Sequence, residues 1–461
     1  MRIERDTLGE KEVPLHVYWG IQTQRAMENF VLSSRKVHRG LIGAMAMVKK
    51  AAAEANRDLG FLTTDQARTI ILACEEIIDG KLHDHFPLDA FQGGAGTSTH
   101  MNVNEVIANR ALEMLNQPKG TYDALHPLDH VNRHQSTNDV YPTALKIASI
   151  YALRDLSQVV ADLQGVLQVK EKQFASILKI GRSELQEAVP MTLGMEFSAW
   201  AEAIARDRWR CFKCEERLRV VNLGATAIGT GLGADREYIF LVIEKLRVLT
   251  GLGLSRAENL AGDTANADVY VEVSGILKAL ACNLAKISTD LRLLNLLGEI
   301  QIPAVQPGSS IMPGKVNPVI EEAVSQVAFQ VMANDSLITQ AASRGSLQIN
   351  EFMPLIALAL LESLEILTNA VRIFAKHIKT IEANESRCRH YLEHSQEIIT
   401  AFVPFIGYEH CQDILKEFQK IPGSKHFREF LQDKFGKELV GQVLSPQNLL
   451  SLGYHKKGQS C

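Results

Sequence analysis

Hydrophobic residues recur at helical spacing along most of the chain beyond residue 40, whereas the alternation of polar and apolar residues typical of strands is scarce. The pattern therefore predicts an all-α protein. Long helices are expected over residues 43–58, 64–79, 101–115, 142–177, 191–220, 236–250, 267–297, 318–342 and 354–380.

Several of these helices are apolar around much of their circumference. Between residues 267 and 297, hydrophobic side chains recur at positions such as Val269, Val273, Leu277 and Leu284. A helix of this kind must be covered on most sides, either by the other helices of a bundle or by other subunits.

The lengths of the predicted helices divide the chain into three regions. Residues 1–136 contain shorter helices and turns, residues 137–385 contain the long helices, and residues 386–461 return to short elements. The sequence thus predicts three domains: a mainly helical N-terminal domain, a central bundle of long helices and a small C-terminal helical domain.

A chain of 461 residues, 46% of them hydrophobic, is long enough to bury a large core. Its formal net charge of -4 is modest and its basic residues are scattered, so nothing indicates binding to nucleic acid or to a membrane surface. No uninterrupted apolar run is expected to be long enough to span a bilayer. Seven widely spread cysteines fit free thiols in a reducing compartment. We therefore expect a cytoplasmic protein that acts on a small molecule.

No metal or nucleotide cofactor is indicated by the sequence. Cys211 and Cys214 form an isolated C-x-x-C inside a predicted helix, without the second pair or nearby histidine that would complete a zinc site. Residues 229–233 are glycine-rich but have neither the spacing nor the preceding strand of a phosphate-binding loop.

Residues 308–318, with the sequence GSSIMPGKVNP, combine hydroxyl, amide and ammonium groups in one predicted loop. Its glycines and prolines disfavour regular structure, while Ser309, Ser310, Lys315 and Asn317 are residue types that can abstract a proton or hold an anion. Asn317 followed by proline is also a typical helix start, with asparagine as the N-cap. Because a helix N-terminus carries partial positive charge, the segment suits a carboxylate or phosphate.

Three other polar segments are expected to lie just ahead of helices, at residues 93–104, 135–139 and 181–190. Helix capping alone explains any one of them, since Ser, Thr, Asn and Asp are the usual caps. Together with the loop at 308–318 they predict one anion-binding site lined by helix N-termini.

Such a site suits β-elimination from a succinate-like acid. The proton next to a carboxylate is very weakly acidic, so its removal leaves a carbanion whose charge must be delocalised into that carboxylate and stabilised by preorganised donors. A serine serves as the base only when its alkoxide is held by backbone N–H groups and a cation, which a closing loop can supply. Lys315 is the candidate for that cation.

The loop matches the signature Gly-Ser-Ser-x-x-Pro-x-Lys-x-Asn at every fixed position from Gly308 to Asn317. With this motif, and with similar segments from residue 2 to residue 407, the chain resembles the aspartase/fumarase superfamily over nearly its whole length. Within that superfamily it is more similar to aspartases than to class II fumarases at residues 188–194 and 222–231.

The resemblance implies a homotetramer whose central domains form one large helix bundle and whose active sites are each shared by three subunits. It also implies that Ser309 is the general base. The side chains that it assigns to the two substrate carboxylates are Thr97, Ser136, Thr137, Asn138, Ser183, Ser310, Lys315 and Asn317. Glu184 and Glu322 stand where fumarases have a His–Glu pair, so two carboxylates are expected to face each other here.

Three departures distinguish this chain from the family pattern. Glu184 replaces a His or Gln, Met195 precedes Glu196 where the family has Gln, and the segment at residues 294–299 is shortened. We hypothesise that Glu184 binds a cationic group, either the leaving ammonium or an amine on an aspartate derivative. A salt bridge from Glu184 to Arg182 or to another subunit is the alternative.

The sequence therefore predicts a carbon–nitrogen lyase that eliminates ammonia, or an amine, from L-aspartate or an aspartate derivative to give fumarate. Fumarate hydratase is the alternative, but the missing fumarase-type histidine at position 184 counts against it, because water is a poor leaving group without an acid. A third interpretation is an impaired relative kept as a scaffold, against which the intact set of Ser309, Lys315 and Asn317 speaks.

Overall fold

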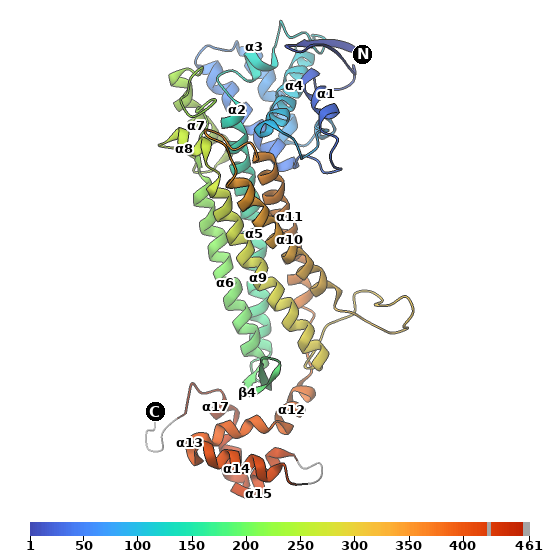
Figure 1. Ribbon diagram of the computed structural model, residues 1–461, viewed down its shortest axis with the longest axis vertical. Coiled ribbons are helices and arrows are strands. Elements are labelled where there is room, and N and C mark those ends of the chain that lie inside the picture. The colour runs from blue at the N-terminus through green and yellow to red at the C-terminus, as the bar shows by residue number, and fades with distance from the viewer. Residues whose placement is uncertain (422–425, 455–461) are drawn as a thin grey trace. The chain divides into compact units, whose positions relative to one another are not determined.

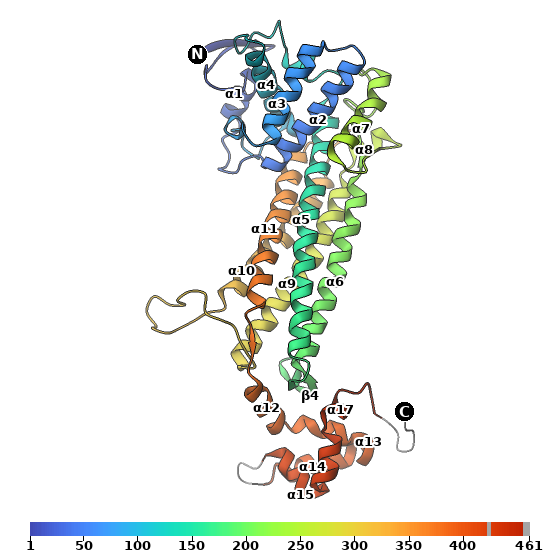
Figure 2. The same cartoon turned by 180° about the vertical axis from the view of Figure 1, so that it is seen from behind.

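The computed structural model describes residues 1–421 and 426–454, and it confirms the predicted all-α fold. Figures 1 and 2 show its elements from opposite sides. The five long helices are α5 (Thr137–Gln173), α6 (Leu193–Leu218), α9 (Asp268–Leu297), α10 (Val319–Ala342) and α11 (Met353–Ile378).

The shorter elements complete the described part of the chain. Strands pair as β1 (Arg2–Asp6) with β2 (Gly9–Val13), β3 (Leu178–Ser183) with β4 (Gln186–Thr192), β5 (Val220–Val221) with β6 (Ser255–Arg256), and β7 (Ile300–Gln301) with β8 (Glu382–Ala383). The shorter α-helices are α1 (Ile21–Asn29), α2 (Arg39–Asp58), α3 (Thr64–Ile78), α4 (Thr97–Met114), α7 (Arg236–Thr250), α8 (Leu260–Ala265), α12 (Glu385–His394), α13 (Val403–Ile406), α14 (Tyr408–Phe418), α15 (Phe427–Phe435), α16 (Lys437–Val443) and α17 (Pro446–Leu449). Short helical segments of other types occur at His83–His85, Gly94–Gly96, Pro127–Val131 and Gln396–Phe402.

The chain forms two compact units. Unit 1 comprises residues 1–158, 207–282 and 327–369, and unit 2 comprises residues 159–206, 283–326 and the described residues from 370 onward. Each of the five long helices begins in one unit and ends in the other. The predicted division into domains at 1–136, 137–385 and 386–461 stays a prediction.

Within unit 1, the long helices are joined by polar contacts between otherwise apolar faces. Tyr270 of α9 donates its hydroxyl to the carbonyl oxygen of Pro142 on α5 (3.2 Å), and Ser274 donates to Asp335 on α10 (2.8 Å). Tyr270 and Ser274 are buried, at 1% and 3% exposure. Buried polar groups need such partners, so these bonds fix the lateral order of the helices.

Within unit 2, the same kind of contact joins the other halves of the helices. Ser198 of α6 donates to Glu171 of α5 (2.8 Å), and the indole of Trp200 donates to Asp290 of α9 (3.2 Å). The short helices that follow residue 385 enclose an apolar core that includes Phe402, and Ile180 of β3 also packs into it.

Helix α5 begins five residues earlier than predicted and carries Pro142 within it. A proline cannot donate the N–H that would bond the carbonyl four residues before it, so the Asn138 carbonyl is left without its helical partner. The side-chain amide of Asn222 donates to that carbonyl instead, at 3.0 Å. Asn222 is fully buried, and this tertiary bond allows the helix to continue through the proline.

The segment at residues 181–190 lies just ahead of a helix, as predicted, because α6 begins at Leu193, but Ser183 does not stand at that helix start. The segment belongs to the antiparallel hairpin of β3 and β4, in which Ser183 pairs with Gln186 across a two-residue turn. Both turn residues, Glu184 (φ 53°) and Leu185 (φ 61°), have the left-handed backbone that a tight hairpin turn requires. Such turns usually contain Asn or Gly, which explains why this sequence gave no hairpin signal.

Among the described residues, α11 is the one helix that must be considered as a membrane span, although Glu362 and Glu365 interrupt its apolar residues. By length and composition this helix qualifies, although 67% of its most apolar window is buried inside the protein. Leu360, Leu364 and Phe374 are fully buried, as expected of a core helix in a helix bundle.

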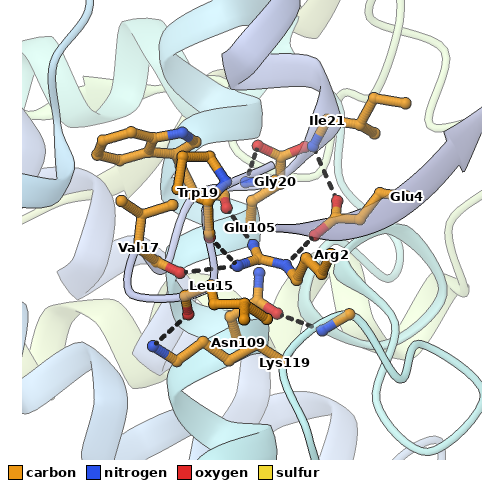
Figure 3. Close-up of polar contacts among 12 residues, drawn as sticks. Arg2, Glu4, Leu15, Val17, Trp19, Gly20, Ile21, Glu105, Asn109 and Lys119 are labelled. Carbon is orange, nitrogen blue, oxygen red and sulfur yellow. Dashed lines mark hydrogen bonds and ion pairs between the residues drawn. The ribbon is translucent and has the colours of Figure 1, made fainter. Parts of the chain in front are cut away.

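The N-terminal hairpin is tied to α4 by a buried polar network, shown in Figure 3. The guanidinium of Arg2 pairs with Glu4 at 2.7 Å. Glu105 of α4 accepts hydrogen bonds from the Gly20 backbone (2.9 Å) and from the Thr23 hydroxyl (2.6 Å). Burial raises the pKa of Glu105 to about 7, an effect that these donors oppose. The network holds the start of α1 against α4.

Replacement of Gly96 by alanine is expected to destabilise the protein at the start of α4. Gly96 has φ 92°, and an added Cβ would lie 2.2 Å from the ring of Tyr141, which is 2% exposed and has no room to move aside. Overpacking of this kind costs about 1–3 kcal/mol, so the melting temperature should fall. Gly43→Ala is the matched control: it lies in α2, where an added Cβ meets nothing within 4 Å, and alanine is the better helix former. Equal melting temperatures for Gly96→Ala and the unmodified protein would contradict this account.

Candidate active site

Four of the predicted site residues lie where α4 and α5 begin, in unit 1. Thr97 is the first residue of α4, Ser136 directly precedes α5, and Thr137 and Asn138 form its first turn. The two helix starts are in contact, because Nδ1 of His100 on α4 lies 2.8 Å from Oγ1 of Thr137. Thr137 and Asn138 line a small cavity of about 10 Å³. The structure thus brings this group of residues together.

Local hydrogen bonds set the orientation of these side chains. The Thr97 hydroxyl donates to the Gly94 carbonyl at 2.8 Å, and the Asn138 amide donates to the Ala227 carbonyl at 2.7 Å. The Ser136 hydroxyl accepts from the Asn138 backbone N–H at 3.3 Å. To donate to a carboxylate, the Thr97 hydroxyl must therefore exchange its local partner for the ligand.

A buried carboxylate, Asp139, holds the backbone next to this group of residues through hydrogen bonds. Its oxygens accept hydrogen bonds from the backbone N–H groups of Ser136 (3.0 Å), Gly224 (3.1 Å) and Thr226 (3.1 Å). Burial raises the pKa of Asp139 to about 6, while the three donors act in the opposite direction. The carboxylate joins the start of α5 to the segment around residue 225, whose Ala227 carbonyl holds Asn138.

The predicted catalytic loop lies in unit 2 between β7 and α10, and it extends away from the helices as a long excursion (Figure 1). The Ser309 hydroxyl oxygen accepts hydrogen bonds from the backbone N–H groups of Ile311 (3.2 Å) and Met312 (2.9 Å). This is the geometry of a serine turn, and two N–H donors aimed at one oxygen also favour its negatively charged form. Ser310 and Lys315 are exposed on the same loop.

The two ends of this loop are bonded together at Gly308. Its N–H donates to the Lys315 carbonyl (2.8 Å), and its own carbonyl accepts from the Asn317 side-chain amide (2.8 Å). A Cβ at Gly308 would lie 2.7 Å from the Lys315 carbonyl oxygen, so only glycine fits. Helix α10 begins at Val319, one residue later than predicted, and the Asn317 side-chain amide closes the loop.

Ser183 and Glu184 lie at the exposed tip of the β3–β4 hairpin in unit 2, whose base is held by a cluster of charges. Lys179 pairs with Glu299 at 2.7 Å, and Arg182 pairs with the same carboxylate at 2.7 Å. Lys179 and Glu299 are both buried. If one member moved out of this cluster, another charge would be left buried and unpaired, which is costly. The ion pairs therefore fix the position of the hairpin.

The predicted alternative for Glu184, a salt bridge to Arg182, is not what the structure contains. Arg182 pairs with Glu299, and its guanidinium lies over the Tyr391 ring at 4.8 Å. Glu184 instead lines a cavity of about 820 Å³ in unit 2, together with Lys286 and other residues of α6 and α9. Its exposed carboxylate is therefore available to a ligand or to another chain.

Glu322 lies in the first turn of α10, where Arg292 approaches its carboxylate to 3.9 Å. In the part of the chain that the structure describes, Glu184 and Glu322 make no contact with each other. The expectation that these two carboxylates face each other is therefore not met within this chain.

Comparison with known proteins identifies the family to which these features belong. The sequence profile of a family described as "Lyase" matches residues 9–333. Aspartate ammonia-lyase of Bacillus subtilis is 48% identical over 414 residues, which cover 88% of this chain and 87% of that protein. Aspartate ammonia-lyase of Helicobacter pylori J99 is 45% identical over 465 residues, 99% of each chain.

The chain belongs to the aspartase/fumarase superfamily. A crystal structure of a fumarate lyase:delta crystallin from Brucella melitensis, bound to cobalt, superimposes with a TM-score of 0.93 at 44% identity, over 98% of this chain and 99% of that one. The predicted family, the fold and the classification as a carbon–nitrogen lyase of the aspartase type are thus confirmed. Among residues 1–421 and 426–454, no group of three His, Cys, Asp or Glu side chains is placed to hold a metal ion.

Sequence reasoning missed Lys49 as a residue that lies behind the candidate site residues at the start of α5. It is fully buried on α2 and donates to the side chains of Asn132 (2.8 Å) and Gln135 (2.9 Å), just before α5. The signal was present, since a lysine on the apolar stripe of an amphipathic helix, next to Val48, requires buried acceptors.

Two buried ionisable residues, Glu321 and His377, lie close together in unit 2, after the loop at residues 308–318. Glu321, on the first turn of α10, is fully buried and neither of its oxygens has a hydrogen-bond partner among the described residues. His377 Nε2, on α11, lies 3.4 Å from Glu321 Oε1 and is itself without a hydrogen-bond partner within those residues. Burial raises the pKa of Glu321 to about 7 and lowers the pKa of His377, so each charged form is disfavoured.

Replacement of Glu321 by glutamine is expected to stabilise this lyase at pH 8 more than at pH 5. The folded-state pKa of about 7 lies above the ordinary glutamate value of 4.5, so the folded protein binds the proton more tightly and loses stability as the pH rises from about 4.5 to 7. Glutamine removes that loss. Melting temperatures measured at both pH values test this, with Glu202→Gln, an exposed carboxylate on α6, as the control. A stabilisation that is the same at pH 5 and pH 8 would exclude an ionised Glu321 as its cause.

Proposed function

We propose that the protein eliminates ammonia from L-aspartate to give fumarate, with Ser309 as the base. The observation that carries the proposal is the pair of backbone N–H groups, from Ile311 and Met312, that point at the Ser309 hydroxyl oxygen. The similar enzymes from Bacillus subtilis and Helicobacter pylori are aspartate ammonia-lyases, and the substrate is a dicarboxylate as in their family.

In the proposed reaction, the Ser309 alkoxide takes the proton from C3 of aspartate. The electron pair of that C–H bond moves into the adjacent carboxylate, which becomes doubly negative, and then forms the C2–C3 double bond as the C2–N bond breaks. Ammonia leaves with the electrons of the C–N bond. The two backbone N–H groups lower the cost of forming the alkoxide, because donors to an ionised group favour its charged form.

We assign the binding of the substrate carboxylates to the hydroxyl, amide and ammonium groups already described. Thr97, Ser136, Thr137 and Asn138 occupy helix N-termini, where backbone N–H groups favour anions. The remaining assigned groups are those of Ser183, Ser310, Lys315 and Asn317, with Glu184 and Glu322 as carboxylates near the leaving group. No cofactor is assigned a part in this step.

We infer that the site is completed by other subunits in a homotetramer. Lys315 and Ser310 are exposed on an extended loop, and a site that stabilises a carbanion must exclude water. Large apolar side chains are also exposed on the long helices, among them Phe212 on α6 (65%) and Phe329 on α10 (61%). Other subunits would cover these side chains. A cytoplasmic location stays a prediction.

Fumarate hydratase is the second candidate function. A protonated Glu184 would favour hydration, because it can give its proton to the leaving water. An ionised Glu184 favours an ammonium leaving group instead. The alternatives separate in one assay, because a hydratase adds water to fumarate without ammonium and an ammonia-lyase releases fumarate and ammonia together.

Replacement of Ser309 by alanine is expected to lower kcat for fumarate release from L-aspartate by roughly 10²–10⁴-fold, the usual contribution of a general base. The KM should change much less, since the hydroxyl acts on the proton at C3. Ultraviolet absorbance of fumarate, with ammonia assayed in parallel, measures the rate. Ser343→Ala removes an exposed serine hydroxyl just after the C-terminal end of α10 and serves as the control. A Ser309→Ala protein with unchanged kcat, or an unmodified protein that forms no fumarate from aspartate, would refute the proposal.

Replacement of Glu184 by glutamine is expected to change the preference between aspartate and N-substituted aspartates if Glu184 binds the cationic group of the substrate. The loss of a charge-assisted contact should raise the KM for aspartate on the order of tenfold. Glu187→Gln alters another exposed carboxylate of the same hairpin and should leave the KM unchanged. If the ratio of kcat/KM for aspartate to kcat/KM for N-substituted aspartates is the same in Glu184→Gln and Glu187→Gln, Glu184 takes no part in substrate recognition.

A further inference from the structure

Lys49 lies at the centre of a buried hydrogen-bond network behind Thr137. Its Nζ lies 2.6 Å from Nε2 of His100, 2.8 Å from Oδ1 of Asn132 and 2.9 Å from Oε1 of Gln135. The lysine is fully buried and His100 is 1% exposed. The other ring nitrogen of His100, Nδ1, lies 2.8 Å from the Thr137 hydroxyl.

The chemistry of an ammonium group sets the direction of every bond in this chain. A protonated lysine has three hydrogens and no lone pair, so all three neighbours must accept. His100 therefore accepts at Nε2 and carries its hydrogen on Nδ1, from which it donates to Thr137 Oγ1. The hydroxyl hydrogen of Thr137 is then left for another acceptor, and Thr137 lines the small cavity at the start of α5.

A neutral lysine reverses the direction of this chain. An uncharged amine has two hydrogens and one lone pair, so it can accept from Nε2–H of His100. Nδ1 then becomes an acceptor, and the Thr137 hydroxyl donates to it. In that state the hydroxyl hydrogen points away from the cavity, and only a lone pair is offered to a ligand.

The surrounding groups place Lys49 near the balance between the two states. Burial lowers the pKa of Lys49 to about 7, and the charge of Asp139 on α5 opposes that shift. Cys74 on α3 also faces Lys49, but burial raises the pKa of its thiol to about 12, so it is uncharged in this range. Burial and the neighbouring ammonium lower the pKa of His100 well below its usual value, which keeps the ring neutral. The two side chains nearest Lys49, besides His100, are the uncharged Asn132 and Gln135.

We propose that Lys49 and His100 are positioning residues that turn the Thr137 hydroxyl hydrogen toward a substrate carboxylate, and that carboxylate binding draws a proton onto Lys49. The inference rests on the proposed function, in which Thr137 binds a carboxylate. Carboxylate binding and protonation of Lys49 are linked, because an anion beside Thr137 favours two things at once. It favours the state in which the Thr137 hydroxyl donates to it, and it favours the positive charge of Lys49.

A purely structural role for the network predicts something different. Lys49 also fixes the segment before α5 through Asn132 and Gln135, so its loss could disturb Thr137 simply by loosening that segment. Such loosening would weaken binding at every pH and would take up no proton. Proton uptake and its pH dependence therefore separate the two roles.

The decisive experiment is titration calorimetry of the intact protein with succinate, a dicarboxylate that cannot undergo the elimination. At pH 8, in two buffers of different ionisation enthalpy, the unmodified protein should take up a fraction of a proton per site. At pH 6, where Lys49 is already charged, its uptake should approach zero, and any uptake by Asp139, whose pKa is about 6, should persist in Lys49→Met. Lys49→Met should abolish the uptake at pH 8 and weaken binding on the order of tenfold. Lys50→Met removes the neighbouring lysine, which pairs with Glu75, and should leave both quantities unchanged.

Variants of His100 and Thr137 keep the test decisive if Lys49→Met fails to fold. His100→Leu breaks the chain of bonds, whereas His100→Gln keeps an acceptor and a donor on one side chain and should recover part of the succinate affinity. With Thr137 changed to valine, His100→Leu should cause no further loss of affinity, because its effect passes through the Thr137 hydroxyl. Additive losses, or the same proton uptake in the unmodified protein and the His100→Leu variant, would overturn the inference.

These outcomes are distinct from failure of the proposed function. If the unmodified protein releases no fumarate from aspartate, the proposed function fails whatever the calorimetry shows. If it releases fumarate and binds succinate without proton uptake at pH 8, the proposed function stands and the positioning role is refuted.

Discussion

The structure around the candidate site depends on the requirement that every charge buried among the helices be met by fixed donors or acceptors. Asp139 is the central example. Its carboxylate is buried and accepts three backbone N–H groups, which come from the start of α5 and from the segment around residue 225. Since an unpaired buried carboxylate is costly, these segments are held together wherever Asp139 is ionised. The first turn of α5, with Thr137 and Asn138, is positioned by this constraint.

The same requirement explains the hairpin that carries Ser183 and Glu184. Its two turn residues have left-handed backbone geometry, which costs about 1–2 kcal/mol for each residue that is not glycine. The ion pairs of Glu299 with Lys179 and Arg182 hold the base of the hairpin and can offset that cost. A strained turn held in this way presents its side chains in one orientation, which is a common property of functional sites.

Two buried groups that sequence reasoning did not single out show opposite solutions to the same problem. Lys49 has three acceptors for its three hydrogens, so its charge can be kept inside the protein. Glu321 has no hydrogen-bond partner within the described residues, and burial accordingly favours its neutral form. In the proposed role, the first arrangement sets the direction of the Thr137 hydroxyl, whereas the second makes stability depend on pH.

The sequence by itself determined the helical class and the superfamily, because these depend on local periodicity and on a motif of adjacent residues. The same motif, with the resemblance that it carries, proposed Ser309, Lys315 and Asn317 as the catalytic residues, which stays a prediction. Tertiary structure decided that α5 continues through Pro142, since the bond that replaces the missing one comes from Asn222, far away in the chain. It also decided that residues 181–190 form a hairpin and that Lys49 stands behind Thr137. These features depend on partners distant in sequence, and a local pattern carries no information about such partners.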